Sequence, residues 1–273
     1  MKRPRDARRS RLTGVFRMVA VAYVSLLVIW PVSLVAKNTF TGGLTSLRKV
    51  VHDPNITHAF RLTIWVAVLS VIVNLVFGVG MSLLLVRYRF PGRRLLSALV
   101  DLPLSVSPIV VGLSLVLVYN GRTGWFGPTL EDAGLKVLFA NPAIIMATIF
   151  VSLPLVVREV VPVLEEIGTE QEQAAQSLGA SSRQTFWRIT LPSIRWAVVY
   201  GVVLSLARSL GEFGAVKIVS GNVVGRTQTA TLVVEQRYQN FQQGTAYAAS
   251  FLLASTSIVC IVIVSLARQR SER

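Results

Sequence analysis

About six runs of apolar residues, each long enough to cross a lipid bilayer as a helix, dominate this sequence. A helix needs about 20 predominantly apolar residues to span the hydrocarbon core. The runs that we predict as spans are 15–36, 59–86, 95–119, 142–162, 194–219 and 247–266. The fourth and fifth carry the weakest signal, because Pro154 interrupts one and Arg208 and Glu212 interrupt the other. The sequence predicts an all-α membrane protein with about six transmembrane helices.

The basic residues gather at the ends of these runs, as an inner-membrane protein requires. Charged residues make up 15% of the chain, well below the roughly 25% of soluble globular proteins. The net charge is +15, but basic patches interleaved with aromatic residues are absent, so no nucleic-acid partner is expected. The first run is too long for a removed signal peptide and lacks its cleavage site. The single cysteine, Cys260, excludes an internal disulfide and a cysteine-based metal site.

Lysine and arginine are distributed unevenly between the loops, and this asymmetry predicts the orientation of the chain. Strongly basic segments precede the first run ("KRPRDARRSR"), separate the second from the third ("RYRFPGRR") and follow the last ("ARQRSER"). The loops between the first and second runs and between the third and fourth are poor in basic residues. Both termini and the loop before the fifth run are therefore predicted on the cytoplasmic side of a bacterial inner membrane.

The same pattern divides the chain into four parts. Residues 1–14 form a basic cytoplasmic tail, which anionic membrane lipid would attract. Residues 15–58 hold the first transmembrane helix and an outer loop. Residues 59–267 form the main transmembrane domain, which includes a polar cytoplasmic loop at 169–192. Residues 268–273 form a second cytoplasmic tail.

The polar loop contains the stretch "QAAQSLGASSRQTFWRITLP" at 173–192, in which capping signals predict two short helices. Thr169 and Glu172 have the spacing of a capping box, which predicts that the first helix begins there. Gly179 can adopt the left-handed backbone that ends a helix. This first helix is therefore expected to end at a bend.

Ser181 and Gln184 repeat the capping-box spacing and predict the start of a second helix. Pro192 is expected to limit this helix about three turns further on. Its apolar side chains, expected to be exposed, are Phe186, Trp187 and Ile189. Exposed rings on a polar loop usually indicate a protein partner.

The loop resembles the EAA loop of the ABC importer permeases in the segments "QAA", "GAS", "TFW" and "ITLP". In that family the loop docks as a coupling helix into a groove on a cytoplasmic ATPase. The resemblance implies that the ATPase-coupling residues are Glu172, Gln173, Ala174, Ala175, Gly179, Ala180, Phe186, Leu191 and Pro192. Gln173 stands where the family usually has glutamate, so a salt bridge by that glutamate is not carried over. The alternative is an amphipathic helix on the bilayer surface, but Arg183 and Arg188 supply too little positive charge for it.

Three further segments, at 90–113, 158–166 and 206–229, resemble the sulfate/thiosulfate and molybdate branch of these permeases, and most closely its CysW type. The resemblance implies a type I ABC importer permease fold and transport of sulfate, with thiosulfate expected as well. The implied partners are a second, CysT-like permease, a CysA-like cytoplasmic ATPase dimer that binds ATP–Mg, and an extracytoplasmic sulfate-binding protein. No cofactor is expected in this chain, because its nearest approach to a phosphate-binding loop, at 221–227, is one residue short and has Arg226 in place of lysine.

Ionisable residues inside a span are costly and often functional. Arg208 and Glu212 lie four residues apart, so they are expected to pair on one helix face. The pair would either line the anion path or pack two permeases together. Asp101 and Lys217 are expected nearer the span ends, where their side chains can reach the membrane surface.

Ser105 and Ser107 are the other candidates for the transport path. The nearby prolines, Pro103 and Pro108, could open the helix so that the two hydroxyl groups face a tetrahedral anion. Polar packing between helices would explain the same residues. No metal is expected at His52 and His58, because no cysteine or carboxylate has ligand spacing around them.

Three rival functions differ from sulfate import. A molybdate or tungstate permease would carry a tetrahedral dianion of similar charge. An ion-coupled secondary transporter would need a titratable relay within the spans, yet only the Arg208–Glu212 pair is present. A membrane-embedded prenyl- or phosphotransferase would need a carboxylate cluster at a span end to bind a metal. The Glu131–Asp132 pair lies on the predicted outer side, with no further carboxylate beside it.

Overall fold

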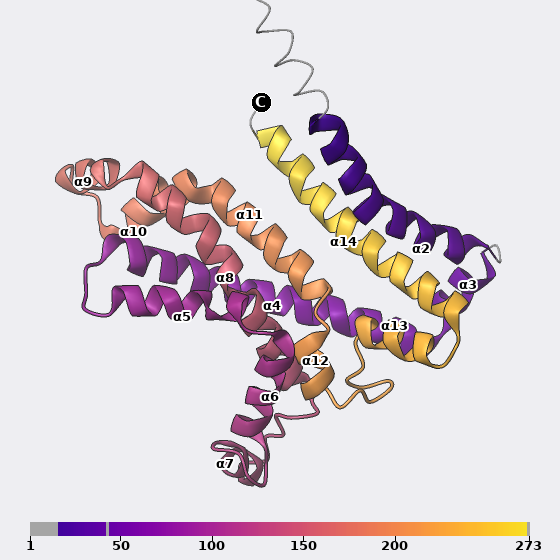
Figure 1. Cartoon of the computed structure of the whole chain (residues 1–273). Helices are drawn as coiled ribbons and strands as arrows, with labels where there is room; N and C mark the ends of the chain where they lie inside the picture. The colour runs from indigo at the N-terminus through magenta and orange to yellow at the C-terminus, as the bar shows by residue number, and fades with distance from the viewer. Residues whose placement is uncertain (1–15, 42–43, 272–273) are drawn as a thin grey trace, which may run out of the picture.

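The computed structural model describes residues 16–41 and 44–271, with side chains up to residue 259 and at 262. The predicted tail at 1–14, Val15, the last two residues and the side chain of Cys260 lie outside this description. Every regular element within the described ranges is a helix (Figure 1), which confirms the all-α prediction.

In the first half of the chain the elements are the π-helix η1 Ser25–Ile29, α2 Trp30–Phe40, α3 Thr45–His52, α4 Pro54–Arg87, α5 Arg93–Ser105, α6 Pro108–Tyr119 and α7 Gly127–Asp132. The second half contains α8 Asn141–Ile167, α9 Glu170–Ser177, α10 Ser182–Thr185, the π-helix η2 Phe186–Thr190, α11 Leu191–Leu210, α12 Gly214–Val219, α13 Ala230–Gln239 and α14 Gln243–Ser271.

Four helices in the described residues are long and apolar enough to cross a membrane, and one bent pair raises the number to five. The four are Phe16–Phe40, Pro54–Arg87, Asn141–Ile167 and Ser182–Leu210, and the bent pair is α5 with α6. These elements overlap the first five predicted runs, with differences in the third and fifth. The sixth run, 247–266, lies within α14, part of whose side chains are outside the description.

The third predicted span, 95–119, is wrong as a single helix, because α5 and α6 meet at an angle of 111°. The chain leaves the helix at Val106 and Ser107, where ψ is 136° and 135°. The ring of Pro108 disfavours helical backbone at the residue before it, which accounts for the conformation of Ser107. The helix opens beside Pro108, as expected, whereas Pro103 lies inside α5 and does not interrupt it. Ser105 and Ser107 are both exposed at the break.

The fifth predicted span, 194–219, is also wrong as one helix, since α11 ends at Leu210 and α12 follows after a break at 211–213. The packing of α12 on α6 explains the break. A Cβ atom on Gly112 of α6 would lie only 2.8 Å from the carbonyl oxygen of Ala215 in α12. The backbones of these two helices touch, and α12 leaves the line of α11 to reach this contact (Figure 1).

The centre of the fold consists of α4, α8 and α11 packed against one another (Figure 1). Glycines allow the close approach. A Cβ atom on Gly78 of α4 would lie 2.8 Å from the side chain of Val156, and one on Gly201 of α11 would lie 2.9 Å from the Cα atom of Val156. In a membrane the hydrophobic effect does not drive helices together, because lipid tails are as apolar as the helix surfaces. Small residues at such contacts let the helices approach closely and gain van der Waals contact instead.

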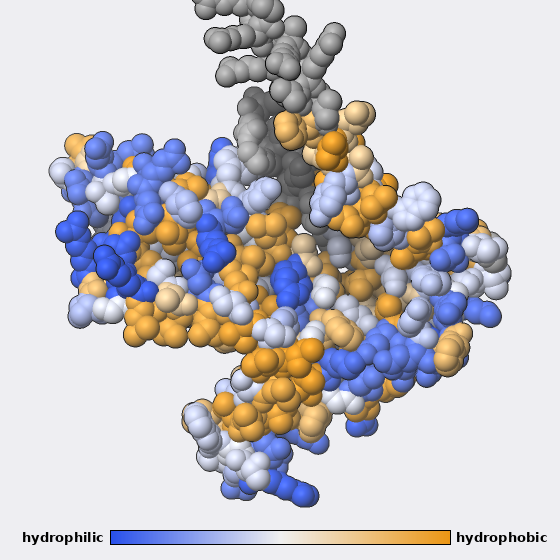
Figure 2. All heavy atoms as spheres, viewed as in Figure 1, coloured by the Kyte–Doolittle hydropathy of each residue, from blue (hydrophilic) through white to orange (hydrophobic). Residues whose placement is uncertain are grey.

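The helices α2 and α14 form a separate pair along one flank of the molecule (Figure 1). Phe40 and Phe251 meet edge to face, with ring centroids 5.4 Å apart. Figure 2 shows hydrophobic residues over much of the surface of α4, α5 and α6. Hydrophilic residues gather around α9 and α10 at one end and around α3 and α13 at the other. This distribution is typical of a protein that crosses a membrane between those two ends.

Candidate functional site

The polar loop folds as a short helix, a bend at the predicted position and the start of a second helix. The first helix, α9, ends before Gly179, which has a φ of +87°, in the left-handed region that favours glycine. The second helix begins with a complete capping box. The hydroxyl of Ser181 accepts from the backbone N–H of Gln184, and the side-chain oxygen of Gln184 accepts from the N–H of Ser181, at 3.4 and 2.9 Å.

The capping box predicted at Thr169 and Glu172 is wrong, because the Thr169 side chain makes no capping hydrogen bond. Its hydroxyl instead accepts from the side-chain amide of Gln173, at 3.1 Å. Glu172 has the right spacing for the box, but its carboxylate points to Arg87 at the end of α4. An ion pair between two elements has overridden the local capping signal.

The prediction that Pro192 limits the second helix is also wrong, since one helix runs from Ser182 to Leu210 and contains this proline near the start of α11. The turn before it, η2, is a π-helix. In a regular helix the proline ring would clash with the carbonyl group four residues earlier, which belongs to Arg188 in η2. The wider turn lies where that clash would occur, so the helix continues.

Arg87 holds the polar loop to the ends of two long helices. Its Nη1 donates to the carbonyl oxygen of Leu164 in α8 at 3.0 Å, and its Nη2 donates to Glu172 in α9 at 3.1 Å. The Nε atom lies 3.0 Å from the other oxygen of Glu172, which is an ion-pair distance without a second hydrogen bond between the two side chains. The Thr190 hydroxyl in η2 donates to the same carboxylate at 2.8 Å. Four elements therefore meet at one largely buried ion pair, which we call the loop clamp.

The apolar side chains of the loop divide into an exposed set and a packed set. Leu178, at the bend, exposes 90% of its surface, and Trp187 is also exposed. Phe186 instead packs against the core cluster that includes Val156 and Ile194, so the expectation that its ring is exposed is wrong. Among the other predicted coupling residues, Gln173, Ala174, Gly179 and Pro192 are exposed, whereas Glu172, Ala175, Ala180 and Leu191 are half-buried.

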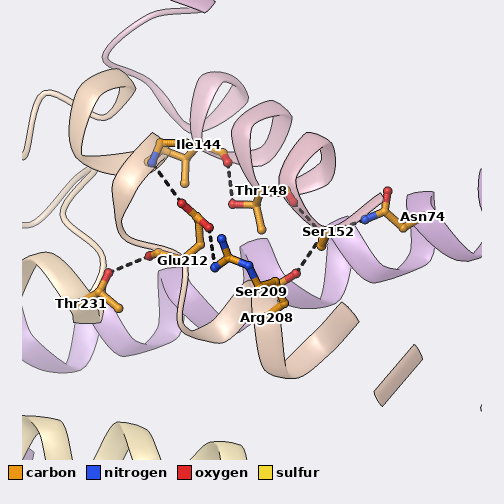
Figure 3. A network of polar contacts seen from close by, with 9 residues as sticks. Asn74, Ile144, Thr148, Ser152, Arg208, Ser209, Glu212 and Thr231 are labelled. Carbon is orange, nitrogen blue, oxygen red and sulfur yellow. Dashed lines mark hydrogen bonds and ion pairs between the residues drawn. The ribbon is translucent and has the colours of Figure 1, made fainter. Parts of the chain in front are cut away.

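A buried polar network crosses the packed centre of the molecule (Figure 3). The side-chain N–H of Asn74 in α4 donates to the Ser152 hydroxyl in α8 at 2.8 Å, and the Ser209 hydroxyl in α11 approaches the same oxygen at 3.3 Å. Ser152 in turn donates to the carbonyl oxygen of Thr148 at 2.6 Å. No sequence pattern predicts this network, because serine and asparagine within apolar runs carry no spacing signal of their own.

Arg208 and Glu212 pair as predicted, Arg208 in the last turn of α11 and Glu212 in the break before α12 (Figure 3). Arg208 Nη1 lies 2.8 Å from the carboxylate, whose other oxygen accepts from the N–H of Ala215 at 3.0 Å. The Thr231 hydroxyl donates to the Glu212 carbonyl oxygen at 2.9 Å. Glu212 exposes 2% of its side chain and Arg208 exposes 38%. The carboxylate thus caps α12 from a buried position, while the guanidinium reaches an open surface.

The remaining predicted charges have partners on neighbouring helices. Asp101 accepts from Arg158 of α8 at 2.9 Å, so it is paired across two helices and does not need to reach the membrane surface. Lys217 pairs with Glu235 of α13. The ring of His52 lies within hydrogen-bonding distance of a backbone carbonyl of its own helix. Among the described residues there is no group of histidine, cysteine and carboxylate side chains able to hold a metal.

A family model described as "Binding-protein-dependent transport system inner membrane component" matches residues 74–273. The chain is 49% identical over 255 residues to a sulfate transport system permease protein CysW of Synechococcus elongatus, a match that covers 93% of this chain and 89% of the relative. The corresponding Escherichia coli CysW is 41% identical, with 93% and 86% covered. A CysT permease of Salmonella typhimurium is 37% identical, with 93% and 91% covered.

Among solved structures, the chain is similar to one from a bacterial alginate ABC transporter in complex with an alginate-bound periplasmic protein. The TM-score is 0.81 at 18% sequence identity, and the match covers 97% of this chain and 96% of that one. At this identity the likeness concerns the fold. The fold of this chain is that of an ABC importer permease, as the resemblance of the polar loop implied.

Proposed function

Because the chain belongs to the family of binding-protein-dependent transport system inner membrane components, we propose that it is one permease subunit of an ATP-driven importer for sulfate. The observation that carries this proposal is the similarity to relatives named as sulfate permeases over nearly the whole chain. Identity to the CysW relatives reaches 49%, against 37% for a CysT relative, so we assign the chain to the CysW position of a CysW–CysT pair. Thiosulfate, of similar shape and charge, is included in the proposed substrate range.

The energy for transport comes, in this proposal, from a separate cytoplasmic ATPase dimer that binds ATP–Mg. The polar loop is the element that contacts it. The exposed bend at Leu178 and the neighbouring exposed Trp187 supply apolar surface for docking. The loop clamp carries a movement of the docked loop into α4 and α8, because Arg87 bonds to both Glu172 and Leu164. The rigid centre of α4, α8 and α11 would then move as one body between inward-open and outward-open states.

The proposed orientation places the polar loop and both termini in the cytoplasm. It rests on the basic segments at the chain ends and between α4 and α5. The opposite end of the molecule, which includes α3 and α13, then faces outward, where an extracytoplasmic sulfate-binding protein would deliver the anion. The Arg237–Asp53 ion pair at 2.9 Å joins α13 to the start of α4 at this end. It keeps the outer elements attached to the helix whose other end carries the loop clamp.

Reconstitution tests the proposal. The chain, a CysT-type permease and the ATPase are co-expressed, purified as a complex and placed in liposomes with ATP and the binding protein. We expect ATP-dependent uptake of radiolabelled sulfate, competition by thiosulfate, and ATP hydrolysis only when the ATPase is present. Uptake of molybdate or tungstate without sulfate would assign the chain to another anion. Stoichiometric ATP hydrolysis by the purified chain alone would contradict the proposal that a separate ATPase subunit supplies the energy.

A further inference from the structure

The helix α5 presents three chemically different faces. Its residues at 96, 100 and 103 face α8, where Val100 packs with Leu85 and Val157 in one buried cluster. A second, exposed face is apolar and consists of Leu95, Leu99 and Leu102. The third face is polar and consists of Arg94, Ser97, Asp101 and Ser105. The members of this third face recur at intervals of three and four residues, so they form one stripe along the helix. We call it the α5 polar stripe.

Arg158 of α8 reaches across to this stripe and pairs with Asp101, with 2.9 Å between the guanidinium Nε and the carboxylate. Arg158 exposes 56% of its side chain and Asp101 exposes 41%. Both residues lie well inside helices that belong to candidate membrane spans. A second pair on the same two helices, Arg93 with Glu165 at 3.6 Å, lies nearer the polar loop.

An exposed ion pair at this position is incompatible with contact to lipid tails, because charged side chains are costly in the hydrocarbon core of a membrane. In the Arg208–Glu212 pair, by contrast, the carboxylate is enclosed and caps α12. Asp101 has no such enclosure, and within the described residues the hydrogen bond to its side chain comes from Arg158 alone. The stripe therefore faces water or protein in the assembled transporter, whereas the leucine face beside it suits lipid or an apolar partner.

We propose that the α5 polar stripe lines the water-filled path and that Arg158 is the cation that holds the tetrahedral dianion during its passage. The proposal rests on the function proposed above. Asp101 holds Arg158 in place when the path is empty. An arriving dianion takes over the guanidinium, because two negative charges attract it more strongly than one carboxylate. Asp101 then competes for Arg158 again, which allows release.

Hydroxyl groups lie on both sides of this charge along the path. Ser97 and Ser105 are each four residues from Asp101, one helical turn towards either end of α5. Ser107 follows at the break, where α5 and α6 bend away from each other. Neutral donors beside a cation suit an anion that must bind and also leave. Arg208 is less suitable as the binding cation, because its partner Glu212 is also needed to cap α12.

Cysteine accessibility tests the stripe in the assembled complex, on a Cys260→Ser background in lipid nanodiscs. Single variants Ser97→Cys and Ser105→Cys probe the polar face, and Leu95→Cys and Leu102→Cys are matched controls on the apolar face. A charged thiosulfonate reagent should modify both polar-face cysteines and spare both controls, and sulfate should slow modification at position 105. Equal modification of the two faces, or protection of all four positions, would overturn the assignment.

Transport by charge variants tests the role of Arg158. In Arg158→Gln we expect sulfate uptake per assembled complex to fall by about tenfold or more, since a charge-assisted contact is lost. ATP hydrolysis and complex yield should persist. The matched control Arg93→Gln removes an arginine from the second ion pair on the same two helices and should retain most uptake. Equal uptake in the two variants would overturn the role of Arg158, provided that the unmodified complex transports sulfate. Absence of sulfate uptake by the unmodified complex would instead refute the proposed function.

Discussion

Two glutamates, Glu172 in the polar loop and Glu212 at the break after α11, are held in the same way but serve different regions. Each carboxylate pairs with an arginine and accepts one further hydrogen bond, from the Thr190 hydroxyl in one case and the Ala215 N–H in the other. The arginines differ. Arg87 exposes 12% of its side chain and also bonds to a carbonyl of α8, whereas Arg208 exposes 38%.

The difference shows what each region can do. At the loop clamp, the guanidinium has hydrogen-bond partners on two elements and little access to water, so the loop and the helix ends move together. At the α11–α12 break, the Arg208 guanidinium is partly exposed, so some of its N–H donors face open space. A buried pair with partners on two elements transmits force, whereas a half-exposed pair can exchange partners.

The largest effect is expected for Glu172→Gln, which leaves Arg87 charged in a largely buried position. Breaking a buried pair in this way costs about 3–5 kcal/mol. We expect the loop to detach from α4 and α8, so that uptake is lost even where the complex assembles. Uptake and ATP hydrolysis per assembled complex measure this uncoupling. Glu170→Gln, an exposed neighbour on α9, is the matched control, and equal behaviour of the two variants would show that the clamp does not transmit force.

A smaller effect is expected for Glu212→Gln. The amide oxygen still accepts from the N–H of Ala215, but Arg208 loses its counter-charge, at a cost of about 1–2 kcal/mol because water reaches this arginine. We expect thermal stability of the complex to fall slightly. Uptake per complex should fall because an uncompensated cation near the path retains the anion.

The double variant Arg208→Gln with Glu212→Gln separates two explanations. Recovery of uptake per complex in the double variant would show that the single variant suffers from the unpaired charge. Unchanged uptake per complex in both variants would reject a path role and leave the pair as packing residues. A loss in Glu212→Gln as large as in Glu172→Gln would contradict the distinction between the two glutamates.

The contrast within the loop itself is tested by Leu178→Ala and Phe186→Ala. Leu178 is exposed at the bend, so its removal should weaken capture of the ATPase by about 1–2 kcal/mol without changing the stability of the isolated permease. Phe186 packs against the membrane helices, so its removal should lower permease stability first. Titration of the ATPase onto the permease complex measures the first effect, and a thermal melt of the permeases measures the second. The opposite pattern would restore Phe186 as the docking residue.

An effect of similar, small size is expected for Gly179→Val at the bend. A Cβ atom at this position meets nothing within 4 Å, so the cost comes from the left-handed backbone alone, at about 1–2 kcal/mol. Gly179→Asn, which tolerates this conformation better, is the control. Uptake and ATPase capture should fall in the valine variant and be largely kept in the asparagine variant. Equal losses would show that the side-chain space at the bend, and not its backbone, matters for docking.

Much of this protein follows from its sequence. The apolar runs are long enough for spans, and the left-handed Gly179 and the Ser181–Gln184 capping box involve residues within one turn of each other. The pairing of Arg208 with Glu212 is equally local, since residues four apart share a helix face. Such features depend on backbone geometry over a few residues, which the sequence specifies directly.

The tertiary structure decided the rest, because the partners are far apart in the chain. Arg87 draws Glu172 away from the capping box that its spacing predicts, and Asp101 meets Arg158 only where α5 packs on α8. The contact of α12 with α6 likewise ends the fifth span earlier than its apolar length suggests. In a membrane protein, the packing of the helices determines which polar side chains meet inside the fold. Because the two partners can be far apart in the chain, the spacing of residues in the sequence does not predict them.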